Sequence, residues 1–89
     1  ISVDVQFYGG VDEPIPDEAV MRERMADQAM LAYEVLAAHC PIHRFSVRYH
    51  HRGTEGKQGG MLWNWITVDL PQGETMTRDH ILTGELVTN

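Results

Sequence analysis

The sequence has little cysteine, few basic residues and no long hydrophobic run. Cys40 is the only cysteine among 89 residues, so no disulfide can form within the chain. No stretch of about 18 apolar residues occurs, which excludes a membrane-spanning helix in this segment. Seven Lys and Arg residues stand against 13 Asp and Glu residues, for a net charge of −6. This balance argues against a nucleic-acid partner, because phosphate binding needs a cationic surface.

Nucleotide and cofactor motifs are missing as well. The glycine-rich stretch 53–60 lacks two parts of a phosphate-binding loop, because His51 stands where a glycine is needed and Gln58 where Ser or Thr is needed. A helix should follow such a loop, whereas a strand is predicted here. We therefore assign no cofactor, no metal and no catalytic residue. A non-enzymatic protein is the better reading of this composition.

Length and composition indicate one small globular domain over residues 1–89. The chain is 43% hydrophobic and 22% charged, which is typical of a folded domain. It begins with Ile1 rather than Met, so we expect that it can be part of a longer protein. The lone Cys40 fits a reducing compartment and slightly favours the cytoplasm.

One long helix is predicted between Asp17 and His39. Asp17 follows Pro16 and is placed to cap the first turn, and Pro41 disfavours α conformation in the residue before it. Apolar residues recur on one face at helical spacing, which predicts a buried stripe: Met21, Met25, Ala29, Ala32, Val35 and Leu36. We expect the opposite side, with Glu23, Asp27 and Glu34, to be a solvated acidic surface.

Three strands are predicted by period-two alternation. They cover residues 1–8, 44–50 and 61–70, and Gly9 and Gly10 are expected to end the first. The stretch 51–60 is predicted to be a flexible connection. The C-terminal segment has two readings: Thr77 can cap a short helix from Arg78 to about Leu86, or a fourth strand can run through residues 81–87.

These elements predict an α+β fold. A strand, helix and strand in series make two parallel strands with a right-handed crossover. The third strand is then antiparallel to the second. The result is a two-layer βαββ sandwich with the long helix on one face of a small mixed sheet and a C-terminal helix or strand.

The sheet face opposite the helix is the predicted binding surface. Alternation places two tryptophans and other aromatic and basic side chains on this face: Tyr8, Arg48, His50, Trp63 and Trp65. A large apolar patch is seldom left in water, so three coverings are open, namely the C-terminal segment, a second copy, or a ligand or partner protein. Tyr, Trp and Arg dominate interface energies. We expect a binding module that forms a homo-oligomer or docks a protein partner through this face.

The alternative is a small metal-binding or hydrolytic domain. Its candidate residues lie between 39 and 51, where five side chains carry possible zinc ligands: His39, Cys40, His43, His50 and His51. A second Cys or His pair at matching spacing is missing, so the sequence favours the binding module.

Overall fold

The computed structural model of the protein describes residues 1–11, 16–52 and 61–88. The stretches 12–15 and 53–60 lie outside the described residues, and the second of them makes up most of the predicted flexible connection. The elements follow one another along the chain as β1 (Ser2–Val11), α1 (Glu18–Ala37), β2 (Arg44–Arg52), β3 (Met61–Asp69), the 3₁₀ turn η1 (Pro71–Gly73), α2 (Arg78–Thr83) and β4 (Val87–Thr88). This is the predicted α+β architecture.

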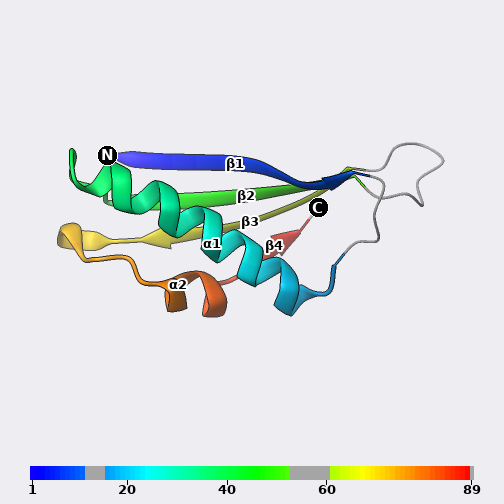
Figure 1. The fold of residues 1–89 in the computed structure, drawn as a ribbon. Helices are drawn as coiled ribbons and strands as arrows, with labels where there is room; N and C mark the ends of the chain where they lie inside the picture. Colours follow the sequence, from blue (N-terminus) through cyan, green and yellow to red (C-terminus); the bar gives the residue numbers. More distant parts are fainter. Residues whose placement is uncertain (12–15, 53–60, 89) are drawn as a thin grey trace.

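The sheet is mixed, with strand order β1-β2-β3-β4. β1 and β2 are parallel, and β2–β3 and β3–β4 are antiparallel pairs. α1 contacts β1 and β2, whereas α2 contacts β3 and α1. Figure 1 shows α1 running diagonally across one side of the strands with α2 beside it. No helix in the described part of the chain is long and apolar enough to cross a membrane.

α1 begins and packs as its sequence predicts over most of its length. The Asp17 carboxylate accepts a hydrogen bond from the Val20 amide at 2.9 Å, which satisfies one of the free N–H groups of the first turn. Met21, Met25 and Ala29 are buried against the sheet. The core that they complete lies on β2 and β3 and includes Phe45, Val47, Tyr49, Ile66 and Val68.

Val35 is the exception in the predicted stripe, because 64% of it is exposed. It lies on the flank of α1 that faces away from α2. On that side the sheet ends with its terminal strand, β1. Ala26, on the opposite flank, is fully buried instead. The prediction for Val35 was wrong because helical periodicity does not show where a sheet ends.

β1 is longer than predicted and continues through Gly9 and Gly10 to Val11. The pairing with β2 shifts register between Tyr8 and Gly10, so the glycines form an irregularity inside the strand rather than its end. A Cβ atom at Gly9 would overlap the ring of Tyr49. Glycine is needed here because the backbone passes directly over a buried tyrosine.

The C-terminal segment contains both elements that the sequence left open. α2 follows Thr77, whose backbone amide donates to His80 Nδ1 at 2.9 Å, and Ile81 is buried in the core. β4 then pairs with β3, and the Thr88 hydroxyl donates to the side-chain oxygen of the buried Asn64 at 2.6 Å. The helix is therefore shorter than predicted, and the strand begins later.

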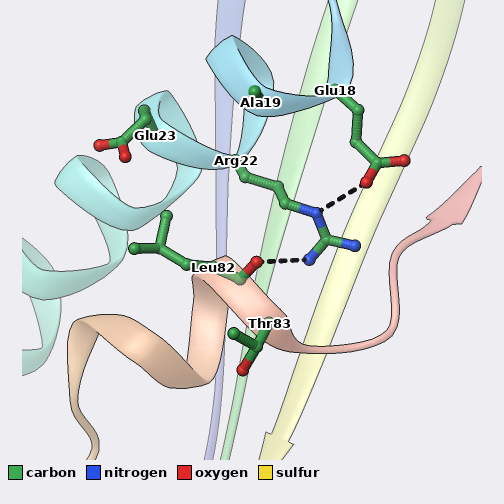
Figure 2. A pocket seen from close by; sticks show the side chains of 6 residues that line it. All are labelled: Glu18, Ala19, Arg22, Glu23, Leu82 and Thr83. Carbon is green, nitrogen blue, oxygen red and sulfur yellow. Dashed lines mark hydrogen bonds and ion pairs between the residues drawn. The ribbon is translucent and has the colours of Figure 1, made fainter.

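Arg22 of α1 holds the C-terminal end of α2. Its Nη1 atom lies 3.2 Å, 3.3 Å and 2.6 Å from the carbonyl oxygens of Ile81, Leu82 and Gly84, and its Nε atom donates to Glu18 at 3.1 Å. Figure 2 shows the guanidinium between the Glu18 carboxylate and α2. The last carbonyls of a helix have no partner within it, so a cation at this position is favourable.

Arg78 makes the reciprocal contact from the start of α2. Its guanidinium donates to Glu23 and, at 2.7 Å, to Asp27 of α1. Hydrogen bonds to Glu23 and then Asp27 raise the pKa of Arg78. The acidic side of α1 is thus not simply solvated, as the sequence suggested, because two of its carboxylates bind α2.

We predict that Arg22→Ala destabilises the domain by about 1–3 kcal/mol, because three carbonyl oxygens lose a charged donor. Arg22→Lys should recover only part of this loss, since an ammonium cannot reproduce the planar fork. Glu18→Ala is the matched control, and it should cost less than about 1 kcal/mol because the Glu18 side chain is 67% exposed. Urea unfolding measures all three. Equal losses for Glu18→Ala and Arg22→Ala would contradict the role assigned to the carbonyl contacts.

Candidate functional site

The face of the sheet opposite α1 and α2, called the open face below, carries the side chains predicted to bind a partner. Strand register places them in rows. Tyr8, His50 and Trp63 occupy one row, and Gln6, Arg48 and Trp65 the next. Val87 of β4 lies beside Trp65. The rows at the other end of the face are polar and contain Asp4, Ser46, Thr67, Arg44 and Asp69.

Tyr8 covers His50 at one end of the open face. Tyr8 is 71% exposed, and its ring centroid lies 5.1 Å from that of His50. His50 itself is only 3% exposed. A partner can therefore touch Tyr8, whereas His50 supports the ring from beneath. The sequence placed both residues on one face, but alternation alone does not reveal which side chain lies on top.

Arg48 joins the charged and aromatic halves of the open face. Its Nε atom lies 3.4 Å from Asp4 Oδ2, and its guanidinium carbon lies 6.0 Å from the centre of the Trp65 ring. A cation over an indole face gains about 0.5–1 kcal/mol at exposed sites. Trp65 is half-buried. Three of the predicted residues, Tyr8, Arg48 and Trp65, are therefore accessible on this face.

Trp63 occupies the expected strand position, opposite His50 in the register of β2 and β3. Its side chain lies outside the described part of the structure. The backbone thus supports its placement on the open face, and its contacts remain a prediction.

The polar end of the open face pairs its own charges. Arg44 Nε lies 2.8 Å from Asp69 Oδ1, and the hydroxyls of Ser46 and Thr67 lie 3.0 Å apart. Two basic side chains, Arg44 and Arg48, thus balance two acidic ones, Asp4 and Asp69, among the described side chains of this face. The whole chain has a net charge of −6, so its negative charge is concentrated elsewhere.

The C-terminal segment does not cover the open face, although this was one of the coverings the sequence allowed. α2 packs against α1 and β3 on the helical side, and β4 extends the sheet at its edge. Figure 1 shows α2 on the same side of the strands as α1. Within the described residues, no helix lies on the open face.

The possible metal ligands are dispersed. His50 and His51 are neighbours on β2, so they point to opposite faces of the sheet. His43 precedes β2, seven residues or about 23 Å of strand from His50. Cys40 donates to the Leu36 carbonyl at 3.4 Å, at the end of α1. Across residues 1–11, 16–52 and 61–88, no three His, Cys, Asp or Glu side chains are grouped as metal ligands would be.

A second polar cluster, on the helical side, was missed by the sequence reading. The buried Tyr49 hydroxyl accepts a hydrogen bond from Arg24 Nη1 at 3.1 Å and lies 3.2 Å from His51 Nδ1. Because Arg24 donates, the hydroxyl proton is available to His51. A cavity of about 200 Å³ adjoins the cluster and is lined by Phe7, Tyr8, Gly9, Arg24, Asp27 and Gln28. The cluster satisfies a buried hydroxyl, and no periodic pattern could have indicated it.

Comparisons with protein-family models, with curated proteins and with solved structures give no match.

We predict that Tyr8→Ala exposes His50 to chemical modification. Diethyl pyrocarbonate modifies accessible imidazoles, so His50 should be unreactive in the unmodified chain and reactive in the variant. His51, which is fully buried on the other face, should stay unreactive in both, and the exposed His43 should react in both. Mass spectrometry of the peptides reports each site. Equal modification of His50 with and without Tyr8 would contradict the covering described above.

Proposed function

We propose that this chain is a non-enzymatic binding module, and that two copies bind each other through the open face. The observation that carries the proposal is the one-sided distribution of the helices. Both described helices pack on one side of the sheet, while the other side carries the exposed Tyr8 and the half-buried Trp65. Aromatic side chains at the centre of a sheet face favour burial against another surface.

The size of the open face supports a contact between two sheets. β1, β2 and β3 have 10, 9 and 9 residues, so together they cover about 30 Å by 15 Å. The flat area of the three strands is about 450 Å² per copy, without the additional area that the side chains contribute. Two copies together therefore bury a total near the ~1,000 Å² expected of a specific interface. Sheets that pack face to face lie about 10 Å apart, a separation that side chains such as Tyr8 and Trp65 can fill.

The charges of the open face support a second copy as the occupant. Arg44 and Arg48 balance Asp4 and Asp69 on this face, so two copies can meet without net repulsion there. Like charges concentrated at a contact would oppose association. The rest of the surface, which carries the excess negative charge, is less suited to self-association. The same balance argues against nucleic acid, which needs a cationic field.

Tyr8, Arg48 and Trp65 are the residues expected to contribute most of the binding energy. Tyr, Trp and Arg are the common hot-spot residues of interfaces. Tyr8 presents a ring that is already held against His50, and Arg48 is held between Asp4 and Trp65. Side chains that are ordered before binding lose less conformational entropy when they bind. The alternative occupant, a different partner protein, would use the same residues.

We predict that Trp65→Ala weakens self-association about tenfold or more, the loss expected for a hot-spot residue. Tyr8→Glu should have a similar effect, because it places a charge among the aromatic rings. Its matched control is Thr75→Glu, an exposed position outside the sheet, which should leave association unchanged. Analytical ultracentrifugation gives the dissociation constants, and circular dichroism confirms folding.

Two results would overturn this proposal. One is an unmodified chain that is monomeric at all accessible concentrations. The other is an association that neither Trp65→Ala nor Tyr8→Glu weakens while both variants stay folded.

A further inference from the structure

We infer that the chain has a second self-association surface, formed by the outer edge of β1 and the adjoining flank of α1, and that a second copy occupies it in antiparallel orientation. This surface is separate from the open face, and the inference does not depend on the function proposed above. A second copy bound at this edge would extend the sheet from four strands to eight. Four properties of the described residues support it.

The backbone of β1 directs half of its hydrogen-bonding groups outward. The Ile1 carbonyl accepts from the His43 amide at 2.9 Å, and the His43 carbonyl accepts from the Leu70 amide at 2.8 Å. N–H and C=O groups of successive strand residues point to opposite sides. By this alternation Val3, Val5 and Phe7 pair with β2, while Ser2, Asp4, Gln6 and Tyr8 direct their backbone groups away from it. β1 is terminal in the strand order, so no described strand accepts them.

The edge lacks the usual protection against strand pairing. Natural edge strands are commonly short or carry proline, lysine or a strong bulge. β1 has 10 residues, with no proline, lysine or arginine in Ser2–Val11. Its irregularity lies between Tyr8 and Gly10, which leaves the stretch 2–8 regular. A regular edge of this length is suited to adding another strand.

Apolar side chains gather beside this edge. Val3, Val5 and Phe7 point toward the helical side but are only half-buried. Leu31 and Val35 of α1 are 63% and 64% exposed. Val35 is spaced along α1 from Arg24 and Gln28, which line a cavity together with Phe7 and Tyr8, and helical periodicity places these three α1 residues on one flank. Leu31 instead lines a cavity with Asp27 and with Arg78 of α2. The flank of α1 and the edge of β1 therefore form one incompletely buried apolar surface.

A two-fold axis through Val5 fits the pairing of β1 with its copy. In such a pair, a residue with outward-directed backbone groups must lie opposite another such residue. This axis meets that requirement, because it places Asp4 opposite Gln6 and Ser2 opposite Tyr8 of the second copy. It uses the whole regular stretch 2–8. An axis one residue earlier would bring two Asp4 side chains directly opposite, which is unfavourable. Gln6 already donates to Asp4 within one chain at 3.4 Å, so this amide and carboxylate are compatible neighbours.

The same axis brings the apolar flanks together. When two strand edges pair about an axis perpendicular to the sheet, both copies keep their helices on the same side. α1 crosses the sheet diagonally and contacts β1 and β2 (Figure 1). Where it lies between these strands, which are about 4.8 Å apart, it would come within about 10 Å of the α1 helix of the second copy, close to the usual packing distance of helices. Val35 of each copy then faces the α1 flank of the other. An extended peptide from a different protein could pair with β1, but it would leave this flank exposed.

Hydrogen exchange gives a direct test because the amides of β1 alternate. In the 89-residue chain the amides of Val3, Val5 and Phe7 should be protected by β2 at every concentration. The amides of Asp4, Gln6 and Tyr8 should be protected only when two edges pair, and they should lose protection on dilution. If these three amides exchange rapidly at concentrations where the chain is associated, the inference is overturned.

Variants separate this surface from the open face. Gln6→Pro removes an outward N–H, Val35→Glu places a charge on the flank, and each should weaken edge pairing about tenfold or more. Gln6→Ala keeps the N–H and loses only the side-chain amide, so it should weaken association much less than Gln6→Pro. Ala37→Glu adds the same charge elsewhere on α1 and should behave as the unmodified chain. Protection of the Val5 amide confirms that β1 remains folded.

Combination with Trp65→Ala makes the outcomes distinguishable. If both surfaces act, the chain forms assemblies larger than a dimer, Trp65→Ala and Gln6→Pro each leave a dimer, and the double variant is monomeric. A dimer that Gln6→Pro dissociates and Trp65→Ala does not supports the edge and overturns the open face. A dimer that Trp65→Ala dissociates and Gln6→Pro does not overturns the inference that the β1 edge associates. A chain that is monomeric overturns it as well.

Discussion

The docking of α2 against α1 determines which surfaces of the domain are left exposed. Arg22 contacts three carbonyl oxygens at the end of α2, and Arg78 at its start binds two carboxylates of α1. The first contact holds the end of α2 and the second holds its start. Together they fix both the position and the orientation of α2. With the C-terminal segment held on the helical side, the chain has no described helix left to cover the other face of the sheet.

The two proposed binding surfaces follow from this arrangement. α1 lies over β1 and β2 and α2 over β3, which buries the centre of one sheet face but leaves Val3, Val5 and Phe7 half-buried at the edge. The opposite face retains its aromatic and paired charged side chains. A domain of 89 residues has a high ratio of surface to volume. Association of copies is a common way for such a domain to complete its burial.

Most of the fold could be predicted from local patterns. Alternation located three strands, and the capping residue Asp17 located the start of α1, because both depend on neighbours in the sequence. The contacts that Arg22 and Arg78 make between α1 and α2 could not be predicted, since they join residues 51 to 62 positions apart. The exposure of Val35 was missed for a similar reason: it depends on where the sheet ends. The two readings of the C-terminal segment were each correct for a part of it.

The same distinction applies to the candidate site. Alternation placed Tyr8, Arg48 and Trp65 on one face, but it did not indicate that His50 is buried while Tyr8, whose ring lies beside it on the neighbouring strand, is exposed. Strand alternation also separates His50 from His51, so proximity in sequence overstated the grouping of the possible metal ligands. The cluster of Tyr49, Arg24 and His51 forms only because α1 crosses over the sheet and brings Arg24 to β2. No spacing in the sequence indicates this crossing.

The central claim is that the surface left uncovered by α1 and α2 binds another copy of the chain. Sedimentation equilibrium of the unmodified chain over a range of concentrations, followed together with the fluorescence of its tryptophans, tests this claim most directly. If the copies associate through this surface, the mass is above that of one chain, and it falls on dilution while the tryptophan emission shifts to longer wavelength. A single-chain mass and constant emission at every concentration would contradict the claim.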